Sequence, residues 1–154
     1  MRAGRGGGRR VRRVDYRTLA DLRHHIRRFL QVREAAARAA GIESQQYVVL
    51  LQLKALGAPP PTIGVLAERL LVRHHTAVEL VDRLVERGMV RRVREPGDRR
   101  EVRVALRPAG SAVLRKLATR SMEELARDGP ALVTALSRLL RAARRPAAQK
   151  KRRR

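Results

Sequence analysis

The chain contains no cysteine and no tryptophan, and it has only one phenylalanine and two tyrosines among its 154 residues. The lack of cysteine excludes disulfides, thiol nucleophiles and cysteine-ligated zinc. The scarcity of aromatic residues means that the core must be aliphatic, and a hydrophobic content of 44% can supply one. No apolar run approaches the roughly 20 residues of a membrane span, and no apolar stretch follows the basic N-terminus as in a secretory signal. We therefore expect a cytoplasmic protein without a membrane partner.

Acidic residues are few compared with basic ones. The chain holds 37 Lys or Arg against 14 Asp or Glu, for a net charge of +23. Residues 1–13 hold six arginines and residues 141–154 hold eight Lys or Arg, and neither segment contains an acidic residue. The remaining 23 basic and all 14 acidic residues lie between them. Both the ends and the body therefore predict a polyanionic partner, most commonly nucleic acid.

Both ends of the chain have the composition of disordered basic arms. Residues 1–14 are rich in Gly and Arg without an amphipathic period, and residues 145–154 start with Arg-Pro and end in a charge run. Whether they have a specific target or only keep the protein in solution stays open at this point. In either case they should strengthen non-specific binding to phosphates.

Hydrophobic periodicity predicts four helices in the first half of the chain. A long helix over about 16–40 ends at Gly41, and its apolar stripe should face another subunit or the C-terminal helices. A second helix, about 45–56, can be capped by Ser44, and three prolines then break the chain. Thr62 is a good N-cap for a third helix through Leu70. A fourth helix, about 73–87, ends at Gly88.

The period then changes to that of strands. Residues 89–94 and 101–107 alternate, and residues 95–100 between them contain Pro-Gly-Asp, which is turn chemistry. This pattern predicts a β-hairpin with a basic tip. Two more helices are expected after it, about 108–128 and 131–143, because Gly129-Pro130 should separate them.

Two short helices joined by a tight turn and followed by a basic hairpin predict a mainly α fold, a winged helix-turn-helix. Residues 87–107 hold eight arginines against three acidic residues, where a wing needs positive charge. A helix fits the DNA major groove, and arginines at a hairpin tip suit the negative potential of the minor groove.

The stretch from Pro61 to Gly110, PTIGVLAERLLVRHHTAVELVDRLVERGMVRRVREPGDRREVRVALRPAG, resembles the MarR family of transcriptional regulators. Its most specific part is the wing sequence Asp98-Arg99-Arg100. The resemblance extends over about Tyr16 to Arg141. It implies one domain over 15–144, with a DNA-binding lobe at about 45–107 and dimerisation helices at about 16–40 and 108–143.

The resemblance also implies roles for individual residues. The fourth helix would be the recognition helix, and the hairpin would be the wing. Glu79 is acidic where some relatives carry Arg, so it could accept from a cytosine amino group but would repel a phosphate. The expected DNA-binding residues are Arg73 and His74 at the helix entry, His75, Thr76 and Glu79 facing the major groove, and Arg99 and Arg100 in the wing, with Asp98 orienting one of them.

The expected function is therefore sequence-specific binding of double-stranded DNA by a homodimeric transcriptional regulator. The favoured form is a cytoplasmic, nucleoid-associated repressor of a pseudo-palindromic operator, with a small-molecule effector bound between the dimer interface and the DNA-binding lobe. The alternative is an architectural, nucleoid-type protein that coats DNA through its basic arms. An RNA-associated protein is disfavoured because the narrow A-form major groove excludes a helix.

No enzyme, cofactor or metal site is expected. Adjacent residues on a helix point about 100° apart, so His74 and His75 are poorly placed to chelate one ion. The serines have no base at a recognisable spacing, and no hydrolase elbow or nucleotide-binding loop occurs.

Overall fold

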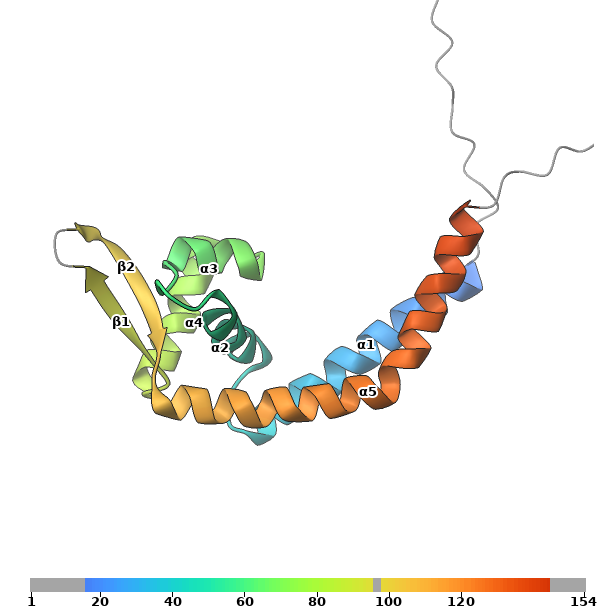
Figure 1. The fold of residues 1–154 in the computed structure, drawn as a ribbon, viewed down its shortest axis with the longest axis horizontal. Helices are drawn as coiled ribbons and strands as arrows, with labels where there is room; N and C mark the ends of the chain where they lie inside the picture. Colours follow the sequence, from blue (N-terminus) through green and yellow to red (C-terminus); the bar gives the residue numbers. More distant parts are fainter. Residues whose placement is uncertain (1–15, 96–97, 145–154) are drawn as a thin grey trace, which may run out of the picture.

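The computed structural model describes residues 16–95 and 98–144, with side chains for 16–94 and 101–143. Helices α1 (Tyr16–Ala39), α2 (Ser44–Leu56), α3 (Ile63–Leu70) and α4 (His74–Glu86) are followed by strands β1 (Val90–Glu95) and β2 (Asp98–Leu106) and by helix α5 (Pro108–Arg144). The predicted mainly α fold with a two-stranded hairpin is confirmed. Figure 1 shows a lobe, formed by α2 to β2, and an arm, in which α1 lies along α5.

The lobe has an aliphatic core to which every one of its elements contributes. Ala36 and Ala37 of α1, and Leu114 and Leu117 of α5, join the same core and so attach the arm to the lobe. The large side chains that are almost wholly buried are Leu50, Leu66, Leu84, Val49, Val81, Val90 and Val104.

Among the described residues, none of the helices combines the length and the apolar content of a membrane span.

The predicted glycine stops of α1 and α4 are confirmed. Gly41 and Gly88 have φ of 78° and 67°, in the left-handed region that glycine adopts without a Cβ penalty. The N–H of the residue after Gly88, Met89, donates to the carbonyl of Leu84 (2.9 Å), and an equivalent bond closes α1. The last carbonyls of both helices are therefore satisfied as each chain segment turns away.

Helix α3 ends in the same way but without glycine. Leu71 has φ of 55° and its side chain is 93% exposed, while the N–H of Val72 donates to the carbonyl of Ala67 (3.1 Å). The left-handed conformation costs a residue with a Cβ roughly 1–2 kcal/mol. Since the exposed leucine side chain offsets little of this cost, the turn between α3 and α4 is strained at one residue.

Replacing Leu71 with Gly should raise the free energy of unfolding by about 1 kcal/mol, because it removes the Cβ penalty without loss of buried area. Chemical denaturation measures the change. Leu71→Ala is the matched control, because it also removes the side-chain atoms beyond the Cβ but keeps the Cβ itself. A glycine variant no more stable than the alanine variant would contradict a strained turn.

Two predicted helix boundaries are wrong. Ser44 does not cap α2; the N-cap is Glu43, whose N–H donates to Oε1 of Gln46 at 2.9 Å. Gly129-Pro130 does not end a helix, because α5 runs through both residues. A proline inside a helix removes one hydrogen bond and bends it, and Figure 1 shows the bend in α5. The helix continues because packing on α1 extends past the bend, where Ala135 is buried.

The arm is joined to the lobe at Met89. The N–H of Arg107 donates to the Met89 carbonyl (2.9 Å), and the first turn of α5 packs closely against the same peptide group. A Cβ built on Gly110 would lie 2.1 Å from the Met89 oxygen, so only glycine allows this approach. The end of α4, the start of β1 and the start of α5 therefore meet at one peptide group.

Candidate nucleic-acid interface

Helix α4 has one buried and one exposed face. Its buried side chains, Ala77, Leu80, Val81 and Leu84, contribute to the lobe core. On the other side His74, His75 and Glu79 are exposed, and Thr76 is half-buried. The structure therefore brings the four predicted contact residues of this helix to its N-terminal half, on a surface free to meet a large partner.

The N-terminus of α4 is electropositive. Its N-cap, Arg73, has an extended backbone and makes no capping hydrogen bond with its side chain, and the first turn contains no acidic residue. Unsatisfied N–H groups and the helix dipole favour an anion at such a position. Arg73, His74 and His75 are exposed at this end of the helix and carry further donors, which suits a phosphate at the helix entry.

Two of the four Asp, Glu and Arg side chains of α4 are paired, and Glu79 is not one of them. Asp82 accepts from Arg92 of β1, and Arg83 donates to Glu43 at 3.0 Å. Glu79 has no ion pair or hydrogen bond with another described residue, and it lies one turn after His75 and Thr76. An exposed carboxylate that is not held by a neighbouring arginine remains available as an acceptor.

The hairpin extends further than the sequence predicts. The strands pair in an antiparallel register from Val90↔Leu106 to Arg94↔Val102, and then Glu95 pairs with Asp98 across an irregularity. Only residues 96 and 97 separate the strands, so the expected loop over 95–100 is wrong. Strand β2 begins with the backbone of Asp98, Arg99 and Arg100. Their side chains lie outside the described residues, and so does the expected orientation of one arginine by Asp98.

A third extended segment supports the base of the hairpin, which the sequence analysis missed. The N–H of Val104 donates to the Pro61 carbonyl (2.9 Å), and Thr62 forms a β-bridge with Arg103. The guanidinium of Arg103 also donates to the Pro60 carbonyl at 2.9 Å. The segment that leads into α3 is thus fixed to the hairpin. The sequence signal for this contact is the position of Arg103 between Val102 and Val104, because a cation in a half-buried strand needs a hydrogen-bond acceptor.

Arg103→Met should lower the free energy of unfolding by about 1–3 kcal/mol, because it leaves the partly buried Pro60 carbonyl without its donor. Arg91→Met is the control, since the Arg91 side chain is exposed on the neighbouring strand and has no ion pair or hydrogen bond with a described residue, so that its replacement should change stability by less than about 0.5 kcal/mol. Equal effects of the two substitutions in denaturant unfolding would show that the bond from Arg103 to Pro60 does not stabilise the fold.

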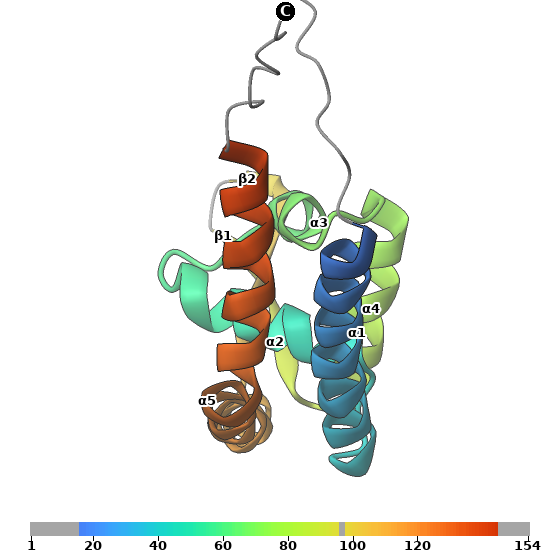
Figure 2. The same ribbon diagram turned by 90° about the vertical axis from the view of Figure 1, so that its right-hand side faces the viewer.

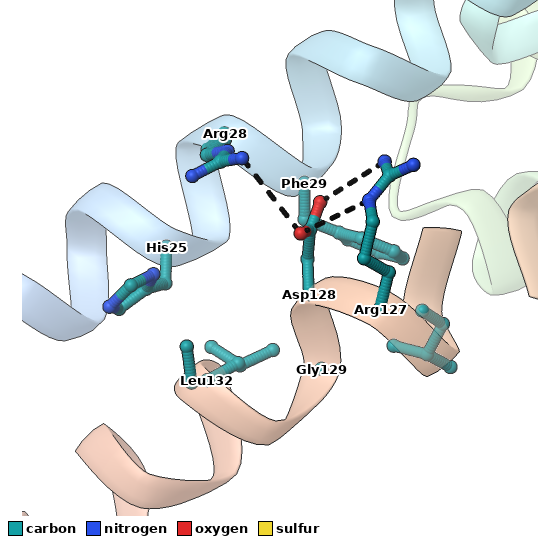
Figure 3. A pocket seen from close by; sticks show the side chains of 9 residues that line it. His25, Arg28, Phe29, Arg127, Asp128, Gly129 and Leu132 are labelled. Carbon is teal, nitrogen blue, oxygen red and sulfur yellow. Dashed lines mark hydrogen bonds and ion pairs between the residues drawn. The ribbon is translucent and has the colours of Figure 1, made fainter. Parts of the chain in front are cut away.

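Hollows occur both inside the arm and where the arm meets the lobe. A cavity of about 100 Å³ lies between α1 and α5. Asp128 on its wall is 3.8 Å from Arg28 and 3.4 Å from Arg127, and Figure 3 shows it between these two arginines and beside Phe29. A wider cleft of about 560 Å³ lies between the α1–α2 turn and the end of α4, lined by residues that include Arg38, Glu43 and Arg83. The cleft lies near the place expected for an effector.

Comparison with known proteins agrees with this geometry. The MarR family model matches residues 40–101. An uncharacterized HTH-type transcriptional regulator of Bacillus subtilis strain 168, YsmB, is 36% identical over 84 residues, which are 54% of this chain and 56% of that protein. The PcaV transcriptional regulator of Streptomyces coelicolor is 30% identical, and its crystal structure aligns over 78% of this chain and 94% of its own with a TM-score of 0.55.

The chain belongs to the MarR family. A DNA-bound structure of a mutant of MepR from Staphylococcus aureus shares the fold at 17% identity, with a TM-score of 0.62 over 84% of this chain and 99% of its own. In this MarR-family chain α3 and α4 form the helix-turn-helix and the hairpin forms the wing, as the sequence predicted. The roles of single residues in DNA contact stay predictions.

Proposed function

We propose that this chain is a homodimeric transcriptional regulator that binds a specific double-stranded DNA sequence and represses transcription from it. The observation that carries the proposal is the exposed N-terminal half of α4 beside a hairpin rich in arginine. The DNA-bound relative MepR supports the assignment of the ligand as DNA. We place the protein in the cytoplasm, on the nucleoid.

The proposed contacts follow from the placement of each residue. The N-terminal half of α4 enters the major groove, where His75, Thr76 and Glu79 reach base edges. Arg73 and His74 meet a phosphate at the helix entry. Arg99 and Arg100 reach the adjacent minor groove, and Asp98 orients one of them.

The proposed second subunit is a copy of this chain that packs on the arm. The arm exposes large apolar side chains along its length, which a monomer would leave in water. Two copies related by a two-fold axis would present two α4 helices to half-sites about 10 bp apart. The exposed apolar residues of the arm include Leu19, Ile26 and Leu30 of α1 and Met122, Val133, Leu136 and Leu140 of α5.

Effector control is the finer part of the proposal. The cleft beside Arg83 lies between the arm and α4, so a small molecule bound there would contact both. A ligand that prefers one spacing of the two α4 helices over another would shift the equilibrium between DNA-binding and non-binding dimers.

Selection from a random duplex pool at several salt concentrations tests the function. We expect enrichment of an inverted repeat by the full chain, with the enrichment weakened or broadened by Arg99→Ala/Arg100→Ala. Steep salt dependence without an enriched sequence would instead support a protein that coats DNA non-specifically.

Glu79→Gln should change the preferred base at one position in each half-site, because a carboxylate accepts from the cytosine amino group whereas an amide pairs with adenine. A change of about 1–3 kcal/mol in discrimination is expected. The same selection experiment measures it. Glu86→Gln is the control, since Glu86 is an exposed acid at the far end of α4. Unchanged preferences in the Glu79 variant would remove this residue from the base contacts.

Val133→Glu should dissociate the dimer. Val133 is 62% exposed in the single chain, and placing a charge there forfeits apolar burial of about 1.5–3 kcal/mol on each copy. We expect the dimer Kd to rise at least about 100-fold in sedimentation velocity. Ala112→Glu, on the exposed surface of the same helix beside the lobe, is the matched control. A Val133 variant that stays dimeric would place the interface elsewhere.

A further inference from the structure

The arm is strongly basic at the end farthest from the lobe. We define the arm tip as residues 16–28 of α1 and 129–144 of α5. These segments hold seven arginines and one acidic residue, Asp21. Figures 1 and 2 show that α1 and the second half of α5 run toward this same end, and that the hairpin lies at the opposite end of the molecule.

Most of this charge is exposed and unpaired. Arg17, Arg23, Arg27, Arg138 and Arg141 are exposed, and none has an ion pair or hydrogen bond with another described residue. Arg28 alone among the tip arginines with described side chains meets a carboxylate, that of Asp128 at 3.8 Å. The tip therefore concentrates positive charge without the acidic partners that balance Arg83 and Arg92 in the lobe.

A second copy adds to this charge where the two tips meet. In a two-fold dimer each copy brings the same seven arginines and one aspartate to the shared arm region. The chain also enters α1 from residues 1–15 and leaves α5 into residues 145–154. Residues 1–15 add six basic residues and one acid, Asp15, and residues 145–154 add six basic residues and no acid. The end of the arm in such a dimer is therefore a strongly electropositive surface that attracts polyanions.

We propose that the arm tip is a second binding surface for duplex DNA, so that one dimer holds two DNA segments. This inference rests on the proposed function, which places the dimer on DNA through its lobes. The α1 helix alone is about 36 Å long at 1.5 Å per residue. Ala37, near one end of α1, joins the lobe core, and Arg17 lies about 30 Å away along the helix. Since the hairpin and the tip also lie at opposite ends of the molecule (Figure 1), a duplex on α4 and the hairpin leaves the tip to meet a different segment.

Duplex DNA fits the tip better than other polyanions do. The tip offers arginines spaced along two neighbouring helices, which suits the regular phosphates of a backbone and reads no sequence. Its rings are those of Tyr16, His24 and His25, and the two histidine rings meet edge to face, 68° apart, so they do not form a flat row on which successive bases of single-stranded RNA could stack. A second DNA segment is also the polyanion at highest local concentration around a protein already bound to DNA.

A capture assay with the full chain tests the proposal. One duplex carrying the selected sequence is fixed to a bead, and capture of a second, fluorescent duplex of unrelated sequence is measured relative to occupancy of the first. The test variant is Arg17→Gln/Arg138→Gln/Arg141→Gln. The control, Lys54→Gln/Arg115→Gln/Lys116→Gln, removes the same charge at exposed positions of α2 and the start of α5. Circular dichroism and sedimentation check that both variants fold and dimerise.

We expect the wild type and the control to capture the second duplex, and the tip variant to capture it at least tenfold less while it binds the first duplex normally. Each lost phosphate contact should also reduce the slope of log affinity against log salt by about 0.9. Capture by the tip variant at the wild-type level would show that the two lobes bridge DNA, and would overturn the proposal. So would stronger competition by single-stranded RNA or anionic lipid vesicles than by duplex DNA at equal phosphate. A selected sequence without capture would refute this inference alone, whereas absence of a selected sequence would refute the proposed function.

Discussion

The contact between Gly110 and the Met89 carbonyl fixes how the two parts of the molecule are arranged. α4 ends at this point, β1 begins there, and α5 starts against the same peptide group, to which Arg107 donates. Any side chain at position 110 would push α5 away from this joint. Helix α4, the hairpin and the arm therefore share one connection, so a change in the angle of the arm would move α4 with it.

This joint makes the arm the natural place from which to control DNA binding. The proposed dimer interface on α1 and α5 would set the spacing of the two α4 helices, because the joint fixes the arm to the lobe. Arg103 adds a second brace by tying the segment before α3 to the hairpin. An effector in the cleft beside Arg83 would act on the same connection, because that cleft has the end of α1 on one side and α4 on the other.

The sequence predicted the elements where local chemistry decides the outcome. Periodicity located the helices, and Gly41, Thr62 and Gly88 act at the helix ends as expected, with Thr62 accepting from the N–H of Val65 at 3.3 Å. The failures occurred where tertiary contacts override local signals. Packing on α1 carries α5 through Pro130, and an irregularity in the ladder absorbs residues expected in the hairpin loop. The position of Arg103 between Val102 and Val104 marks it as a cation in a half-buried strand, but no local pattern identifies its partner, because Pro60 lies 43 residues away. Of the candidate site, the structure tests the placement of the α4 residues but not their contacts with DNA.

The distribution of charge suggests a division of roles within the proposed complex. Helix α4 carries three acidic residues and one arginine, although the whole chain has a net charge of +23. A helix of this composition gains little binding free energy from phosphates of any sequence. On a wrong sequence Glu79 would face base acceptors or phosphates, and this repulsion would lower the affinity. Affinity must then come from elsewhere, through the arginines of the hairpin and the arm. In the proposed complex, base recognition by α4 is thus separate from phosphate binding by the arginines of the hairpin and the arm. This separation would let a very basic protein remain selective, because the helix that contacts the bases adds little non-specific attraction to phosphates.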